Sequence, residues 1–347
     1  MSKKVLLSGV KPTGLCHIGN YFGAMKQFVD LSENYESYIF IADYHALNLI
    51  QNKEEMKKAI LGVLLDYLAI GLDPKKVVIF KQSDISEHTE LAWIFDTIVT
   101  VPYLMRAHAF KDIISKGRVE RYKDQAYLSY VGEGISEEVK NQRIEEDILS
   151  GVNVGTFNYP MLMAADILLY GPDIVPVGQD QKQHVEYARD TAQKFNKIFG
   201  ETFKLPEPMI MKDVAVVPGL DGKKMSKSYG NTIPLFAEYD EIKKCVMKIV
   251  TDSGNDIPEN VFAIHKLLRS EEELKKIYEE KKGKYKEMKD LLVEDLEKFI
   301  APMRERRKEL EKDIPKVLGI LKEGSEKAKK IANIKMTEVR EKVGVSL

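Results

Sequence analysis

The sequence has little cysteine and little tryptophan. Its 347 residues include two cysteines, Cys16 and Cys245, and a single tryptophan, Trp93. Neither cysteine stands at the spacing of metal ligands, and two isolated thiols argue against a disulfide framework. We therefore expect a protein of a reducing compartment that holds no metal of its own.

Long apolar runs and a strong net charge are also missing. No stretch approaches the ~18 uninterrupted apolar residues of a membrane-spanning helix, and the N-terminus lacks a long apolar leader. The formal net charge is −1, with 44% hydrophobic and 31% charged residues. This composition is typical of soluble globular proteins. We expect a cytoplasmic protein without membrane contact, in which a nucleic acid would have to meet local basic patches.

Short apolar runs alternate with amphipathic segments over most of the chain. The runs are typical of buried parallel strands, and the segments between them have helical spacing. The alternation predicts an α/β fold with a Rossmann-like, doubly wound parallel sheet, whose ligands bind beyond the carboxyl ends of strands. We expect strands over 5–9, 38–43, 77–80 and 173–178, and helices over 18–31, 53–71, 87–99, 159–170 and 179–199.

Two segments depart from this alternation. The stretch of about 111–153 is rich in charged residues, and we interpret it as a solvated insertion with helical pieces; a lid or a partner contact stays open. From about residue 240 the pattern is helical and rich in Lys and Glu. We predict a Rossmann-like domain over 1–235 that carries the insertion, followed by an all-α domain over 236–347.

A basic loop, Lys224-Met225-Ser226-Lys227-Ser228, follows a glycine-bearing turn. Such a loop can fold over a polyphosphate, although a lone loop of this kind is usually a solvated turn. Far upstream, residues 12–20 read PTGLCHIGN and place a turn and a helix start directly after the first strand. That geometry aims free N–H groups at an anion, and His17 and Asn20 would each offer a donor to a phosphate.

Asp166 interrupts an apolar helical segment. A buried carboxylate without a partner is costly, so we expect Asp166 to have one. It can be a structural partner, such as a core salt bridge or a backbone amide, or a polar hydrogen of a substrate in an apolar pocket. Tyr159 and Met163 lie about two turns and one turn earlier, so they can line the same pocket.

The HIGN element and the KMSKS loop, in this order, resemble the paired signatures of class I aminoacyl-tRNA synthetases. The segments around Asp166 and over 177–190, VGQDQKQHVEYARD, are similar to those of tryptophanyl-tRNA synthetases. The resemblance covers nearly the whole chain outside the insertion. It implies activation of L-tryptophan by ATP to tryptophanyl-adenylate, with release of pyrophosphate, and transfer to tRNA(Trp). It also implies a homodimer and an anticodon-binding role for 236–347.

The resemblance also implies roles for single residues. His17 and Asn20 would steady the phosphoryl group, Lys224 and Lys227 would clamp the pyrophosphate, and Asp166 would accept the indole N–H. Mg²⁺ would travel with ATP, and no iron–sulfur cluster is expected because the C-terminal region has only Cys245. The implied ATP contacts are Lys11, Pro12, Thr13, Gly19, Asn20, Gly178, Gln179, Asp180, Val217, Lys224, Met225, Ser226, Lys227 and Ser228. The implied tryptophan contacts are Asp166, Tyr159, Met163, Gln181, His45, Val175 and Val177.

Some charged residues receive structural or tRNA-related interpretations. We interpret His184, Glu186 and Arg189 as helix-surface pairs. Two basic clusters, 304–308 and Lys327 with its neighbours Lys329 and Lys330, would meet tRNA phosphates if the resemblance holds. Three other functions stay open: a tyrosyl-tRNA synthetase, a small-molecule nucleotidyltransferase, and a non-catalytic tRNA-binding paralogue.

Overall fold

The structure is a computed structural model that describes residues 3–124, 136–178, 182–210, 217–251 and 257–347. Its centre is a sheet of five strands in the order β3-β2-β1-β4-β5, and all four neighbouring pairs are parallel. The doubly wound parallel sheet predicted from the sequence is confirmed. The strand order reverses between β1 and β4, and such sheets bind ligands at the point of reversal. The strands are Val5–Val10 (β1), Glu36–Ile41 (β2), Val77–Lys81 (β3), Ile174–Val177 (β4) and Glu207–Ile210 (β5).

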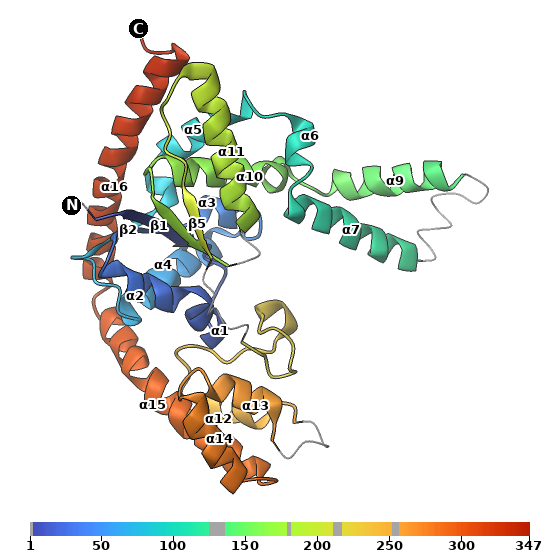
Figure 1. Ribbon diagram of the computed structural model, residues 1–347, viewed down its shortest axis with the longest axis vertical. Coiled ribbons are helices and arrows are strands. Elements are labelled where there is room, and N and C mark those ends of the chain that lie inside the picture. The colour runs from blue at the N-terminus through green and yellow to red at the C-terminus, as the bar shows by residue number, and fades with distance from the viewer. Residues whose placement is uncertain (1–2, 125–135, 179–181, 211–216, 252–256) are drawn as a thin grey trace.

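Helices cover both faces of the sheet because alternate strand residues point to opposite sides. Leu6 packs with Val63 and Leu64 in one buried cluster, whereas the next residue, Leu7, belongs to a second cluster with Phe95. Figure 1 shows α4 on one side of the strands and α10 and α11 on the other. The helices of the sheet region are Ile18–Asn20 (α1), Lys26–Ser32 (α2), Asp43–Ala46 (α3), Lys53–Ala69 (α4), Glu87–Asp96 (α5), Val101–Leu104 (α6), Val154–Leu168 (α10) and Lys182–Phe199 (α11).

The first predicted helix, over 18–31, is interrupted. A five-residue π-helical segment, Tyr21–Met25 (η1), separates α1 from α2. Single π turns of this kind are frequent at functional sites. There are also two short 3₁₀ segments. Gln82–Asp84 (η2) follows β3, and Lys227–Tyr229 (η4) lies in the KMSKS loop.

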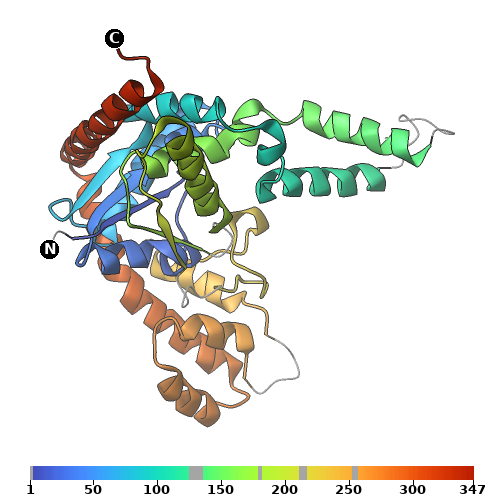
Figure 2. The same cartoon turned by 45° about the horizontal axis from the view of Figure 1, so that its top comes forward.

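The predicted charged insertion contains two helices, His108–Lys123 (α7) and Glu137–Ser150 (α9). They lie side by side and project from the body as an arm in both views (Figures 1 and 2). Gly117 lets the helices approach closely, since a Cβ there would stand 2.9 Å from the Ile148 side chain. Arg121 also pairs with Asp147 at 2.7 Å. The expected helical pieces are present.

The C-terminal helices reach from a small lobe back along the sheet (Figure 1). The lobe contains Tyr239–Met247 (α12), Glu259–His265 (α13) and Glu271–Glu280 (α14), and two long helices, Tyr285–Glu311 (α15) and Ile314–Val343 (α16), follow. Helix α16 packs against β3 so closely that a Cβ on Gly324 would stand 1.8 Å from the Ile79 carbonyl oxygen. None of the helices in the described ranges is apolar and long enough to span a bilayer.

Two arginines of the basic cluster 304–308, Arg304 and Arg307, turn inward, whereas Arg306 and Lys308 are exposed. Arg304 is 7% exposed; it donates to the Ala237 carbonyl at 2.7 Å and pairs with Glu297. Arg307 donates to the buried Asp66 carboxylate at 2.8 Å. The prediction that these two arginines meet tRNA phosphates is therefore wrong, because they bind α15 to the rest of the chain. Lys327, Lys329 and Lys330 are exposed on α16.

Candidate active site

The two signature elements meet at the carboxyl end of β1. The backbone N–H of Ile18 donates to the Ile233 carbonyl at 3.0 Å, and Leu235 N–H donates to the Cys16 carbonyl at 2.9 Å. His17 pairs with Pro234 as an isolated antiparallel bridge. Segments far apart in the sequence are thus joined by backbone hydrogen bonds beside the position where the sheet order reverses.

The KMSKS loop is shaped by a buried asparagine that sequence analysis did not single out. Asn231 is 3% exposed, and its side-chain oxygen accepts from Ser226 N–H at 2.8 Å. Its amide nitrogen donates to Asp221 at 2.6 Å. A Cβ on Gly219 would lie 2.2 Å from that nitrogen, so only glycine fits there. The backbone of Met225 closes the turn by donating to the Val217 carbonyl at 2.9 Å.

Lys227 connects this loop to the N-terminal element. Its ammonium group donates to the carbonyls of Thr13 and Gly14, both at 3.0 Å. Lys224 is exposed, while Met225 is 4% exposed and packs beside Gly19. A Cβ on Gly19 would stand 3.3 Å from Met225 Cβ and 2.9 Å from the His17 ring. The glycine therefore allows the two signatures to touch.

His17 is held as a neutral N–H donor. Its Nδ1 accepts from Asn20 N–H at 3.3 Å, and Asn20 Oδ1 accepts from His17 N–H at 3.1 Å. Burial, with a smaller contribution from the nearby charge of Lys227, lowers the pKa of His17 to about 4. Because Nδ1 is an acceptor, the ring proton is on Nε2. Because the side-chain oxygen of Asn20 already accepts from His17 N–H, the side-chain NH₂ of Asn20 stays available as a hydrogen-bond donor.

Asp166 lies at the centre of a buried hydrogen-bond cluster. It is 1% exposed; Oδ1 accepts from Gln82 Nε2 at 2.7 Å and from His88 Nδ1 at 2.6 Å. Oδ2 accepts from His45 Nε2 at 2.8 Å. The expectation that this carboxylate needs a partner is confirmed, but its partners are side chains of η2, α5 and α3. Nothing in the sequence analysis singled out Gln82 or His88; the polar run that follows β3 was the available signal.

The cluster keeps Asp166 charged. Burial alone would raise the pKa of this carboxyl, but the hydrogen bonds and charges of His45 and His88 outweigh it and hold the pKa at about 2. On the far side of His88, Nε2 lies 2.8 Å from the Tyr170 hydroxyl. Burial raises the pKa of that hydroxyl, so it stays protonated and supports the histidine.

One predicted tryptophan contact, His45, binds Asp166, and a second, Tyr159, packs against His45. The rings of Tyr159 and His45 meet edge to face with centroids 6.2 Å apart. Val175 belongs to the buried hydrophobic cluster that includes residues of α10, and Met163 and Val177 are partly buried and pack against it.

The neighbourhood of Tyr159 also corrects one expectation. Its hydroxyl lies 2.9 Å from Nε2 of His184. His184 is only 5% exposed, so its interpretation as a helix-surface residue is wrong. By contrast, Glu186 pairs with Lys182 at 3.4 Å on the surface of α11.

The remaining predicted contacts lie around the end of β4 and the first loop. Gly178 directly follows β4, whereas Gln179, Asp180 and Gln181 lie outside the described residues. Pro12 is buried and Lys11 is exposed at the end of β1. In the described part of the chain, no three or more His, Cys, Asp and Glu side chains are grouped so that they could hold a metal ion.

Comparison with known proteins places this site in a family. A model of the class I tRNA synthetases for tryptophan and tyrosine matches residues 2–318. A tryptophan–tRNA ligase of Fusobacterium nucleatum is 44% identical over 348 residues, which cover 98% of this chain and 97% of the relative. The chain belongs to the tryptophanyl-tRNA synthetases of class I. Family membership makes it an aminoacyl-tRNA ligase and sets the nucleotidyltransferase alternative aside.

Solved tryptophanyl-tRNA synthetases have the same fold. A Campylobacter jejuni structure, described as complexed with ADP and tryptophan, superposes with a TM-score of 0.82 at 40% identity and covers 98% of this chain and 99% of its own. A tyrosyl-tRNA synthetase of Archaeoglobus fulgidus has a TM-score of 0.61 at 19% identity, covers 88% of this chain and 90% of its own, and shares the fold alone. Relatives at high identity are thus tryptophan enzymes, which disfavours the tyrosyl alternative.

Proposed function

We propose that Asp166 is the specificity residue of a tryptophan–tRNA ligase. The observation that carries this proposal is a charged carboxylate that is 1% exposed and lies among apolar residues. A carboxylate has about four acceptor positions, and the three donors around Asp166 leave one on Oδ2. That position accepts the indole N–H of tryptophan. Tyr159, Met163, His45, Val175, Val177 and Gln181 complete the amino-acid pocket.

In the first reaction the tryptophan carboxylate attacks the α-phosphate of ATP in line and expels pyrophosphate. His17 Nε2–H and the Asn20 amide donate to the phosphoryl oxygens, and a neutral histidine does so without losing its proton at pH 7. Lys224 and Lys227 clamp the pyrophosphate; Lys227 exchanges the two carbonyls of the first loop for phosphate oxygens. Mg²⁺ would travel with ATP and would offset the negative charge of its phosphates.

The nucleotide lies along the seam between the two signatures. Its contacts come from the end of β1, the start of α1, the end of β4 and the KMSKS loop. This placement is supported by the backbone hydrogen bonds that join residues 16–18 to 233–235. The proposed ATP-binding residues are Lys11, Pro12, Thr13, Gly19, Asn20, Gly178, Gln179, Asp180, Val217 and 224–228.

In the second reaction a terminal ribose hydroxyl of tRNA(Trp) attacks the carbonyl carbon of the adenylate, which forms the ester and releases AMP. We assign the catalytic steps to residues 1–235 and tRNA anticodon contacts to the helical residues 236–347. The exposed lysines Lys327, Lys329 and Lys330 of α16 suit phosphate contacts, so binding weakens with salt. The enzyme acts in the cytoplasm.

We also propose a homodimer. Trp93 on α5 is 71% exposed, Val101 on α6 is 61% exposed and Val154 at the start of α10 is 78% exposed. Helix α10 packs against both α5 and α6, so these apolar side chains lie on adjoining elements. A second copy that covers this surface removes the indole from water.

ATP–pyrophosphate exchange with each of the twenty amino acids tests the proposal. Exchange with tryptophan alone is the expected result and establishes activation and specificity together. Exchange with tyrosine instead would keep the fold and refute the role of Asp166. No exchange with any amino acid would favour the non-catalytic paralogue.

A further inference from the structure

Gln82 is fully buried and uses both ends of its side-chain amide. It is the first residue of η2, at the carboxyl end of β3, and is 0% exposed. Its amide nitrogen donates to Asp166 Oδ1 at 2.7 Å, and its amide oxygen accepts from Tyr44 N–H at 3.1 Å. One neutral side chain therefore connects the proposed indole acceptor to the backbone of α3.

The bond to Tyr44 is important because the next residue is His45. Nε2 of His45 lies 2.8 Å from Asp166 Oδ2. Gln82 and His45 thus bind different oxygens of the same carboxylate, and Gln82 also binds the backbone from which His45 extends. The bonds of Gln82 therefore fix both the rotation of the carboxylate and the position of the histidine beside Oδ2.

Helix α3 has only four residues, and its first turn depends on contacts from outside the helix. Its N-cap residue, Ala42, makes no side-chain hydrogen bond, so the first N–H groups of the helix need partners elsewhere. Gln82 is the partner of Tyr44 N–H. Ser83, the next residue of η2, donates to Asp43 through its N–H at 3.0 Å and through its hydroxyl at 2.5 Å. Segment η2 therefore holds the start of α3.

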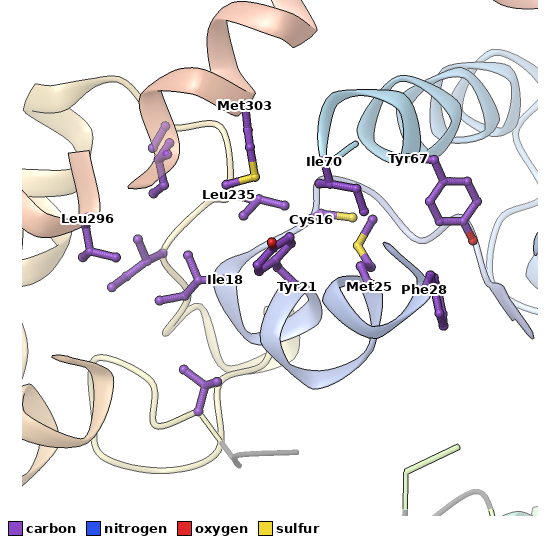
Figure 3. Close-up of a cluster of buried hydrophobic side chains, with 14 of the residues drawn as sticks. Cys16, Ile18, Tyr21, Met25, Phe28, Tyr67, Ile70, Leu235, Leu296 and Met303 are labelled. Atoms are coloured by element: carbon purple, nitrogen blue, oxygen red, sulfur yellow. The ribbon is translucent and has the colours of Figure 1, made fainter. Parts of the chain in front are cut away.

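The strand that leads into α3 is held separately, by α4. The Tyr67 hydroxyl of α4 donates to the Phe40 carbonyl of β2 at 3.1 Å. Figure 3 shows Tyr67 near Phe28 of α2 in a buried cluster, and their rings meet edge to face with centroids 6.4 Å apart. Because β2 is fixed in this way, the contacts that place His45 relative to Asp166 are those between η2 and α3.

We infer that Gln82 is a positioning residue for tryptophan recognition, which keeps one acceptor position of Asp166 Oδ2 directed at the indole N–H. The inference rests on the proposed role of Asp166. Gln82 acts through Asp166 and His45, and as a neutral amide it orients the carboxylate without cancelling its charge. Without Gln82 the carboxylate could turn and His45 would lose its anchor, so the free position on Oδ2 would no longer be fixed.

An amino acid that lacks the indole N–H isolates this role. In β-(1-benzothiophen-3-yl)alanine a sulfur atom replaces the N–H of the ring, and the ring keeps nearly the same shape. Calorimetry with each ligand gives the tryptophan preference, which is the Kd of the analogue divided by the Kd of tryptophan. A positioning role for Gln82 concerns the N–H alone, so it should change this ratio, whereas a general loosening of the pocket should weaken both ligands equally.

Gln82→Met removes both hydrogen bonds and nearly keeps the volume of the side chain. We expect the Kd of tryptophan to rise about 10-fold and the Kd of the analogue to stay within about twofold of wild type, so the preference falls about 10-fold. Gln82→Asn is a second variant, whose amide is one methylene shorter and cannot keep both bonds. We expect it to lower the preference as well.

Three results would overturn the inference or its basis. A wild-type preference in either folded variant would overturn it. Loss of the folded state in both variants, measured by thermal unfolding, would make Gln82 a structural residue and overturn it too. A wild-type enzyme that does not prefer tryptophan to the analogue would instead refute the proposed role of Asp166, so the two failures are distinguishable.

The matched control is Ser325→Ala, which changes the contact of η2 with α16 instead of α3. Ser325 is 6% exposed, and its hydroxyl donates at 2.8 Å to Asp84, the last residue of η2. We expect the tryptophan preference of this variant to stay within about twofold of wild type. An equal loss in the control would show a general effect of η2 and overturn the specific role of Gln82.

Discussion

Replacing Asp166 by asparagine tests the proposed specificity site with almost no change in shape. The carboxylate receives three donors, one on Oδ2 from His45 and two on Oδ1 from Gln82 and His88. An amide has only one oxygen, so its NH₂ group must face at least one of these donors. The least costly orientation turns the NH₂ toward His45, where it takes the place of Oδ2. The Oδ2 atom is the one proposed to accept the indole N–H.

The cost of this change follows from the pKa. The fold lowers the pKa of Asp166 from 3.8 to about 2, which corresponds to roughly 2 kcal/mol of stability at pH 7. Because the folded-state pKa is depressed, this stability is present above about pH 4 and is lost as the pH falls toward 2. We therefore expect Asp166→Asn to lower the free energy of unfolding by about 2 kcal/mol at pH 7, with a difference that shrinks in acid.

Urea unfolding between pH 7 and pH 3 measures the stability difference, and calorimetry measures tryptophan binding. We expect tryptophan affinity to fall at least about 10-fold, because the indole N–H loses its acceptor. Asp147→Asn in the projecting arm is the control, since its pair with Arg121 is 41% exposed at the carboxylate and worth at most about 1 kcal/mol. Wild-type tryptophan affinity in Asp166→Asn, or a difference that does not shrink in acid, would refute this reasoning.

Four further predictions concern the phosphate site, the C-terminal helix and the dimer. Lys224→Ala should slow adenylate formation by on the order of 10²–10³, and unchanged single-turnover rates would contradict its role. Because the pKa of His17 is about 4, its titration should not affect the rate of exchange between pH 6 and 8. The pH profile of His17→Gln over this range should therefore have the same shape as that of the wild type. Gly319→Ala should raise the unfolding free energy by about 0.5–1 kcal/mol, since its Cβ meets no atom within 4 Å, whereas Gly324→Ala should lower it by about 3 kcal/mol; thermal unfolding checks both. Trp93→Glu should give a monomer by light scattering, and a dimer at equal concentration would speak against the proposed interface.

The sequence predicted those parts of the fold that have a local cause. Strands β1 to β4 are short apolar runs that end near glycine, alanine or a polar residue, and their periodicity is visible without knowing the neighbours. Strand β5, Glu207–Ile210, was missed because it is a four-residue edge strand that begins with a charge and contains Pro208. Pairing with β4, rather than its own pattern, makes it a strand.

The site was predictable where local motifs carry it and not where distant residues meet. The HIGN element and the KMSKS loop are contiguous, so their turns and donors could be recognised. His88 lies 78 residues before Asp166, and Arg307 lies 241 residues after Asp66. In a helical sequence each of these looks like an ordinary polar position, and only the packing of α5 and α15 shows that both are directed inward.

Two of the buried carboxylates, Asp66 and Asp166, show that partners as well as burial decide whether a carboxylate keeps its charge. Asp66 faces a guanidinium that cancels its charge, and burial still raises its pKa. Asp166 faces His45, Gln82 and His88, none of which carries a permanent charge, and yet its pKa is lowered. Its negative charge is therefore stabilised by the hydrogen bonds and charges of the two histidines, and it stays available to a polar hydrogen. A pocket built in this way favours a ligand with one N–H on an otherwise apolar ring, and it should bind phenylalanine, which lacks that hydrogen, far more weakly than tryptophan.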